Sequence, residues 1–164
     1  PLEMKAAAKV MGHEVLSEAT LDELFDHVKE IREQCGDRAF LRAYHFLNET
    51  QRAHDEAEAL KKKDIKTFFQ LVRESGRSSW MYLQNISVGS MPESQAVAIG
   101  LAISESVIHE DGAYRVHGGG FAGTIQAFVN KNTTEAFIER MEKTFGKGCC
   151  YILRIRDVGG IRLA

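Results

Sequence analysis

The chain has 164 residues, of which 44% are hydrophobic and 27% are charged, with only two prolines. This length and composition predict one ordered globular domain with a sizeable core and exclude a disordered chain. The formal net charge is only −2, so no long-range field would attract nucleic acid or an anionic membrane, and neither is an expected partner.

The cysteines and the hydrophobic runs indicate the cellular compartment in which the protein is expected. Cys35 is isolated while Cys149 and Cys150 are adjacent, so no Cys-x-x-Cys spacing of a metal or redox site exists. Reduced thiols of this kind indicate a cytoplasmic protein. No apolar run approaches the ~18 residues needed to cross a bilayer, and the first residues do not read as a signal peptide. Starting at Pro1 indicates a lost initiator methionine or a cut from something longer, and both remain open.

Helical patterns fill residues 1–110. The first predicted helix covers 3–11 and stops at Gly12, and a second runs from Thr20, whose spacing to Glu23 is that of a capping box, to about residue 36. Further helices are predicted over 37–60 and from 65, capped by Asp64 with Ile65 among its inward residues. Ser75 and Gly76 are expected to interrupt that helix before a helical turn over 77–83. The segment 93–109 predicts another helix, and its run 96–103 is apolar nearly all round, which predicts that the helix lies inside the fold.

The hydrophobic period changes after residue 110. Segments 113–117 and 124–129 predict two strands, 133–145 a helix, 150–155 a third strand and 161–163 a short fourth strand. The order of elements predicts an α+β fold in which helices pack with a mostly antiparallel sheet.

The turn between the first two strands carries the strongest chemical signal. Four glycines occupy the six positions 118–123. They permit positive φ angles and leave space where a ligand or another backbone must approach. Successive main-chain N–H groups in such a turn can form a concavity that binds phosphate. An ordinary hairpin needs only about two turn residues, which favours a functional loop.

Three familiar glycine motifs do not fit this loop. Gly118, Gly120 and Gly123 match G-x-G-x-x-G, but a strand rather than a helix is predicted after them, which excludes a Rossmann site. The protein-kinase motifs V-A-I-K, H-R-D and D-F-G are absent. The G-x-x-x-x-G-K-[ST] phosphate loop is absent as well.

The segment from Gly112 to Gly123, G-A-Y-R-V-H-G-G-G-F-A-G, resembles the third motif of galactokinases, which are GHMP small-molecule kinases. That motif is typically G-[AS]-R-M-T-G-G-G-F-G-G-C, and this chain has one more residue before the arginine. The resemblance covers nearly the whole chain. It includes Arg42 to His45 with Glu49 and Arg52, Ala57 to Asp64, Phe69 to Ser78, and Pro92-Glu93-Ser94. Ala122, Thr124, His117 and Gly76 depart from the usual residues, which bears on sugar preference more than on the kinase class.

The resemblance implies a GHMP kinase C-terminal domain over residues 1–164, with a ferredoxin-like sheet. Its parts would be a mainly helical 1–110 and, over 111–164, a hairpin with the glycine loop, a helix and two strands. Galactokinases transfer the γ-phosphate of ATP to galactose with Mg²⁺, in a cleft between two domains. The N-terminal motifs R-x-N-x-I-G-E-H-x-D and G-x-G-L-S-S-S are missing here. The implied partners are therefore that N-terminal kinase domain, the sugar and the nucleotide, and the chain alone is expected to be inactive and to bind no cofactor tightly.

The resemblance also implies site residues. The loop that shapes the cleft would be Gly118, Gly119, Gly120, Phe121, Ala122 and Gly123, with Arg115 and His117 as accessory residues and no catalytic or metal-binding residue.

Several of these residues admit simpler interpretations. His117 can face phosphate or make a local hydrogen bond, and Arg115 can pair with a carboxylate on a neighbouring helix. Phe121 is expected to anchor the loop in the core. Arg42, His45, Glu49 and Arg52 share one helical face, which favours structural ion pairs over ligand binding. His54 and Glu58 could hold a metal only with further ligands.

Two other functions compete with the kinase. A non-catalytic α+β module that binds a metabolite or regulates a partner would need no catalytic base. A hydrolase that uses Ser78 or Ser79 with His117 is disfavoured, because neither serine lies in a G-x-S-x-G turn.

Overall fold

The computed structural model describes residues 1–121 and 123–154. They form an α+β structure that is mostly helical, with one small antiparallel sheet. The α-helices are α1 (Leu2–Val10), α2 (Leu21–Asp26), α3 (Val28–Cys35), α4 (Asp37–Lys61), α5 (Ile65–Ser78), α6 (Ala96–Ile108) and α7 (Thr134–Phe145). Short turns of 3₁₀-helix, η1 (Leu16–Glu18) and η3 (His109–Asp111), and a π-helical turn, η2 (Ser79–Leu83), join them. None of the described helices is long and apolar enough to cross a membrane.

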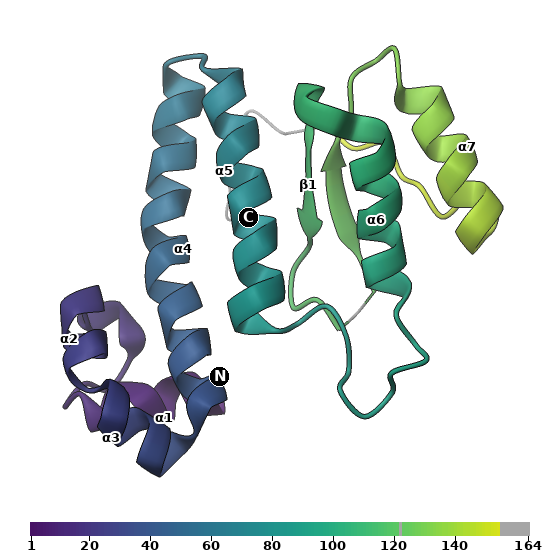
Figure 1. Cartoon of the computed structure of the whole chain (residues 1–164). Coiled ribbons are helices and arrows are strands. Elements are labelled where there is room, and N and C mark those ends of the chain that lie inside the picture. Colours follow the sequence, from purple (N-terminus) through teal and green to yellow (C-terminus); the bar gives the residue numbers. More distant parts are fainter. Residues whose placement is uncertain (122, 155–164) are drawn as a thin grey trace, which may run out of the picture.

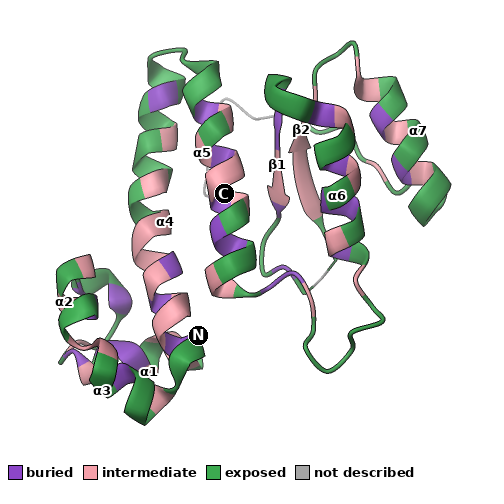
Figure 2. Ribbon diagram, viewed as in Figure 1, coloured by how far each residue is buried: buried purple, intermediate pink, exposed green. Residues whose placement is uncertain are grey.

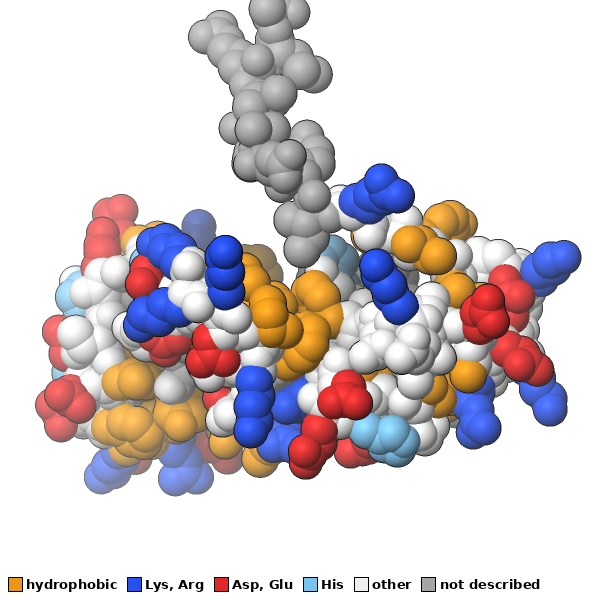
Figure 3. All heavy atoms as spheres, turned by 90° about the horizontal axis from the view of Figure 1, so that it is seen from above, with side chains coloured by type: hydrophobic (Ala, Val, Ile, Leu, Met, Phe, Trp, Pro, Cys, Tyr) orange, Lys and Arg blue, Asp and Glu red, His pale blue; other side chains and the backbone are white. Residues whose placement is uncertain are grey.

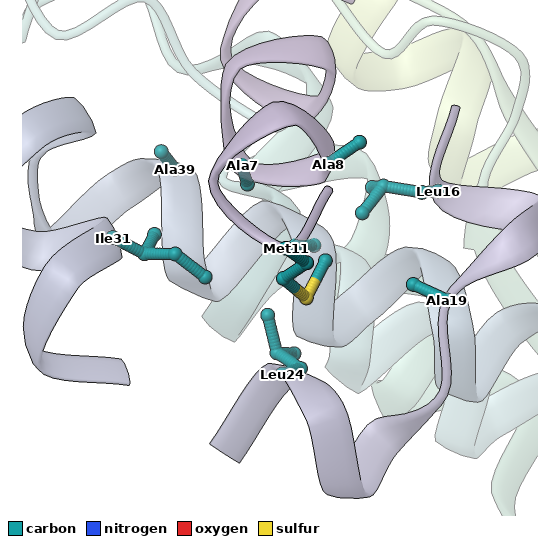
Figure 4. Packing of buried hydrophobic residues seen from close by; sticks show 9 residues of the cluster. Ala7, Ala8, Met11, Leu16, Ala19, Leu24, Ile31 and Ala39 are labelled. Atoms are coloured by element: carbon teal, nitrogen blue, oxygen red, sulfur yellow. The ribbon is translucent and has the colours of Figure 1, made fainter. Parts of the chain in front are cut away.

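The first three α-helices gather around the start of α4 and enclose a core of their own (Figure 4). Leu24 and Ile31 are fully buried there, close to small alanines of α1 and α4. The Thr20 capping box is confirmed, because the Thr20 hydroxyl accepts from the Glu23 amide and the Glu23 carboxylate accepts from the Thr20 amide. The predicted single helix to residue 36 is wrong: the chain bends at His27, which lets α2 and α3 each direct one large side chain into the core.

Helices α4 and α5 run side by side (Figure 1), and the Asp64 carboxylate caps α5 by accepting from the Thr67 amide at 3.1 Å. The expected interruption at Ser75 and Gly76 is wrong, since α5 continues to Ser78. A Cβ atom at Gly76 would lie 3.1 Å from the Arg115 Cβ atom and the Tyr114 carbonyl oxygen. Gly76 therefore lets α5 approach the first strand closely and does not break the helix. Ile65, predicted to face inward, is 47% exposed.

Strands β1 (Ala113–Val116) and β2 (Ile125–Phe128) pair antiparallel, with Ala113 opposite Phe128 and Val116 opposite Ile125. This confirms the predicted hairpin. The hairpin lies between α5 and the α6–α7 pair (Figure 1). Its side chains contribute to three small hydrophobic clusters rather than one large core.

Helix α6 is shorter than predicted and is not buried on every side. Val97, Leu101 and Ile108 are buried, but Ile99 is 47% exposed, and a green stripe runs along this helix in Figure 2. The described residues thus cover only part of the apolar surface of α6.

The mostly antiparallel sheet of more than two strands is not present in the described residues. The predicted third strand is wrong over residues 150–154, which have irregular backbone with Tyr151, Ile152 and Leu153 about four-fifths exposed. Residue 155 and the predicted fourth strand, 161–163, lie outside the described residues.

Candidate functional site

The glycine loop closes the end of the β1–β2 hairpin. Its base is held by the His117 amide, which donates to the Thr124 carbonyl at 3.0 Å, and by a turn in which the Gly123 amide donates to the Gly120 carbonyl at 2.9 Å. Gly118, Gly120 and Gly123 adopt φ angles of +63°, +84° and +82°, the region that the glycine-rich sequence predicted. Gly118 and Gly119 are exposed, and their N–H groups donate to no acceptor within residues 1–121 and 123–154. The loop therefore presents two main-chain donors that no described residue pairs with.

Gly120 fixes the loop against the segment that follows η2. A Cβ atom at this position would lie 2.1 Å from the Asn85 carbonyl oxygen and 2.7 Å from the Asn85 Nδ2 atom. Only glycine fits such an approach at positive φ. Gln84, immediately before, adopts a left-handed conformation that ends η2 and turns the chain toward the loop. The loop thus has a buried, fixed side at Gly120 and an exposed side at Gly118 and Gly119.

Asn85 is a polar residue without a complete set of partners. Its side chain is only 3% exposed, yet its Oδ1 atom accepts no hydrogen bond in the described part of the chain. A buried unpaired carbonyl is costly and is uncommon in folded proteins. Asn85 is therefore a candidate acceptor, next to the exposed glycines, for a donor that the described residues do not supply.

A groove of about 820 Å³ borders the same loop. Its rim includes Phe121 from the loop and Trp80 from η2, which are 55% and 51% exposed. Arg38 and Arg42 of α4 supply positive charge. Gln84, Ile86, Ser87, Val88, Gly89 and Ser90 complete the lining.

Glu3 of α1 holds the two arginines of this groove. Its Oε1 atom accepts from Arg38 at 2.8 Å and its Oε2 atom accepts from Arg42 at 2.6 Å. The hydrogen bond from Arg38 and the positive charge of Arg42 lower the Glu3 pKa despite partial burial. Arg42 also donates from Nε to the Leu83 carbonyl at 3.0 Å, so that α1, α4 and η2 are joined at one point.

A second polar cluster positions the strand that leads into the loop. The Glu49 carboxylate of α4 accepts from Arg115 Nη1 of β1 at 3.0 Å, and also from Ser75 of α5 and from Arg52. Burial opposes ionisation of Glu49, but the Ser75 hydroxyl and the two guanidinium groups outweigh it and lower its pKa. This pairing confirms the structural interpretation of Arg115, whose side chain points to α4 while the loop begins three residues later.

His45 lies beside this cluster and is also buried. Its Nδ1 atom is 2.9 Å from the Ser78 Oγ atom, and both side chains are almost fully enclosed. Burial lowers the His45 pKa, with a smaller opposing effect from Glu49. Ser78 thus pairs with a core histidine instead of His117. Ser79, the other serine of the hydrolase interpretation, is 1% exposed, whereas His117 lies on the surface.

The remaining predicted residues have mixed outcomes. Phe121 was expected to anchor the loop in the core, but it is more than half exposed because the chain around it is held by Gly120 instead. His117 is exposed. Its amide donates to the Thr124 carbonyl, and its carbonyl accepts from the Thr124 hydroxyl at 3.3 Å. Ala122 lies outside the described residues.

Metal and charge patterns add little to the site. Within the described residues no group of three metal-ligating side chains lies together, around His54 and Glu58 or elsewhere. Positive and negative side chains are interspersed on the face seen in Figure 3, in keeping with the near-neutral net charge. The main-chain donors of the loop and the Asn85 acceptor are therefore the chemical features of the site.

Sequence reasoning missed Asn85 and the aromatic groove. Asn85 belongs to no glycine, charge or histidine pattern, and only its contact with Gly120 in three dimensions reveals it. The single tryptophan, Trp80, was a visible signal, since a lone large aromatic residue next to a loop is often part of an interface.

No family model matches the chain. Among curated proteins it is similar to the galactokinase of Homo sapiens (29% identical over 149 residues, 89% of this chain and 34% of the relative). It is also similar to the galactokinases of Bos taurus (28% over 153 residues, 92% and 36%) and of Glaesserella parasuis serovar 5 (26% over 145 residues, 88% and 36%). The chain spans about a third of the length of these relatives. These matches confirm the predicted resemblance: the chain is similar to a portion of galactokinase, along nearly its whole length.

Proposed function

We propose that this chain is the C-terminal domain portion of a galactokinase-like sugar kinase, of the GHMP type, over residues 1–164. The whole protein would transfer the γ-phosphate of ATP to galactose, and the loop Gly118–Gly123 would complete the cleft. The observation that carries the proposal is the loop itself. It offers two exposed glycine amides beside a fixed glycine, in a chain similar to a portion of galactokinases.

The chemistry of phosphoryl transfer suits such a contribution. Transfer relies on positioning and on neutralising charge, with little covalent work for the protein. Main-chain N–H groups held at a tight turn are donors for phosphate oxygens. In the proposed site the Gly118 and Gly119 amides take this role. Asn85 Oδ1 accepts from a hydroxyl or N–H group that the described residues do not supply.

The groove beside the loop has the composition of a surface that another part of a protein covers. Trp80, Val88 and Phe121 are each more than two-fifths exposed around it. Large aromatic side chains of this kind are enriched in interfaces. We propose that the N-terminal kinase domain packs here and supplies the groups that hold ATP and Mg²⁺, while this chain shapes the opposite wall.

The chain alone is then expected to be inactive. The described residues at the loop include no carboxylate aimed at an exposed glycine, and half a cleft cannot align a sugar hydroxyl with a phosphoryl group. Arg115 holds the strand that leads into the loop by its bond to Glu49, and His117 lies at the base of the loop.

The test measures galactose-dependent ATP consumption for the protein encoded by the full open reading frame, beside the 164-residue chain. Turnover by the first and none by the second is expected. Gly119→Val should abolish turnover in the active protein without unfolding it, because no atom of the described residues beyond its chain neighbours lies within 4 Å of a Cβ at Gly119 and its φ is not positive. The valine would instead fill the space in front of the loop.

Two results would overturn the proposal. One is galactose-dependent turnover by a pure sample of the 164-residue chain. The other is full activity in the Gly119→Val protein, which would separate the loop from the cleft. If the full-length protein binds a sugar or nucleotide without turnover, the metabolite-binding module is the better description.

A further inference from the structure

Two cysteine side chains meet just after α7. The Sγ atoms of Cys149 and Cys150 are 3.9 Å apart, with Cys149 exposed and Cys150 partly buried. Cys150 packs at the edge of the cluster that contains Phe137 and Met141, while Cys149 faces solvent. The Cys149 thiol is thus accessible to solvent, and the partly buried Cys150 thiol lies next to it.

This proximity is a property of the local backbone. In a strand, as predicted for residues 150–155, neighbouring side chains point to opposite faces and adjacent thiols diverge. Here the backbone is irregular and follows a turn in which Gly146 and Gly148 have φ angles of +94° and +83°. The Gly148 amide donates to Glu142 of α7 at 2.8 Å, which ties the turn to the helix. The two thiols are therefore held on the same side of a fixed turn.

The surroundings decide what kind of partner fits. A tetrahedral zinc site needs about four ligands, and within the described residues no third metal-ligating side chain joins the pair. Burial and the neighbouring thiol raise the pKa of Cys150 to about 11, so Cys150 stays a neutral thiol near pH 7. A partner that forms bonds to two sulfur atoms suits the pair better than an ion that needs a full set of thiolates.

We propose that Cys149 and Cys150 form a two-thiol binding site for a trivalent arsenical or a chemically similar thiophilic metalloid. The site is separate from the glycine loop and does not depend on the proposed kinase function. With an organic arsenic(III) oxide, Cys149 sulfur forms the first As–S bond and Cys150 sulfur the second. The two thiol protons and the oxide oxygen leave as one water molecule, and arsenic remains trivalent throughout.

The second bond forms within one molecule, which gives the site its selectivity. Once Cys149 has reacted, Cys150 is already at contact distance. An intramolecular second bond raises overall affinity about 100-fold or more over a single thiol. The lone Cys35, with no partner cysteine in sequence, provides an internal comparison.

The experiment treats the reduced chain with one equivalent of phenylarsine oxide and measures the adduct by intact-protein mass spectrometry and the remaining thiols by titration. The expected result is one bound arsenic with two thiols lost, reversed by a dithiol but resistant to excess monothiol. Cys35→Ser should bind as well as the original chain. Cys149→Ser and Cys150→Ser should each lose affinity about 100-fold and become reversible by monothiol.

The proposal is overturned if the original chain loses its adduct to monothiol, or if Cys149→Ser retains tight binding. Cys149 is exposed, so its serine variant should keep the fold, and circular dichroism checks this. A loss that follows Cys35→Ser instead would assign the binding to a different thiol.

Discussion

The helical cluster at the N-terminus and the hairpin with its glycine loop are stabilised in different ways. The first encloses nine buried hydrophobic residues in a single core. Around the hairpin, buried residues are divided among three clusters of three or four. The hairpin region also exposes Trp80 and Phe121 beside the loop and Tyr151 to Leu153 after α7. The first region gathers its buried side chains in one core, although Leu2 and Phe25 remain exposed. The second region divides its buried side chains among small clusters and leaves aromatic surface exposed at the place where the candidate site lies.

The largest expected effect on the free energy of unfolding is that of Gly120→Ala, which adds a Cβ atom on the fixed side of the loop. The added Cβ would lie 2.1 Å from the Asn85 carbonyl oxygen, at a φ of +84°. Steric overlap and backbone strain together should lower the free energy of unfolding by about 3 kcal/mol or more. Urea unfolding followed by circular dichroism measures this. An unchanged midpoint would mean that the loop does not pack on Asn85.

A matched pair of leucines tests the difference between the two regions. Leu24→Ala, in the N-terminal core, should cost about 3 kcal/mol, because the side chain is fully enclosed. Leu101→Ala, in α6, should cost about 1 kcal/mol less, since its small cluster can relax toward solvent. If the two variants lost equal amounts of unfolding free energy in thermal or urea unfolding, the two regions would not differ in how tightly their cores are enclosed.

Removing the charge of Glu49 should weaken the support of the loop. Glu49→Gln leaves Arg115 and Arg52 without their carboxylate, and we expect a loss of about 1–2 kcal/mol, moderated because these side chains are partly exposed. Glu58→Gln, which breaks only an exposed pair with Lys61, is the control and should have no measurable effect. Similar losses in both variants would show that the Glu49 cluster is no more than a surface ion pair.

The pH dependence of stability should report on His45. Its pKa is lowered in the folded state by burial, so below the ordinary value of about 6.5 the unfolded chain binds more protons than the folded one. Stability is therefore complete above about pH 6.5 and falls as the pH is lowered from there. Melting temperatures at pH 7.5 and 5.5 test this, and His45→Asn should reduce the difference. An identical difference in that variant would place the effect on another histidine.

The smallest expected effect on stability is that of Gly119→Val. Within the part of the chain that the structure describes, no atom beyond its chain neighbours lies within 4 Å of a Cβ built on Gly119. The melting temperature should therefore change little, whereas the neighbouring Gly120→Ala should lower it strongly. Differential scanning calorimetry compares the two. A large loss in Gly119→Val would mean that the exposed side of the loop is as tightly packed as the fixed side.

Local signals in the sequence predicted much of this fold. Thr20 with Glu23, and Asp64 with Thr67, define helix starts through contacts within a few residues. Alternating hydrophobic residues on both sides of the glycine run were enough to predict the β1–β2 hairpin. The glycine loop of the candidate site was equally visible, because its composition is unusual over a short stretch.

The errors arose where distant contacts decide the structure. Glycine at position 76 is typical of a helix break in the sequence. In the structure, however, β1 packs against Gly76 and occupies the space that a side chain would fill. Phe121 was assigned to the core by hydrophobicity alone, whereas Gly120 fixes the loop and leaves Phe121 outside. Residues 150–154 carry a strand-like sequence, but strand formation depends on a partner strand that a sequence pattern does not reveal. Asn85 was missed for the same reason.

Helix α4 belongs to both regions. At about 1.5 Å per residue its 25 residues extend for about 38 Å. Its first turns pack against α1 and α3, while its later turns lie along α5. If either region unfolded alone, one face of this shared helix would lose its packing contacts and become exposed to water. We therefore expect the described chain to unfold in a single cooperative step, with coincident transitions for the fluorescence of the tryptophan near the loop and for the far-ultraviolet helical signal, to which both regions contribute.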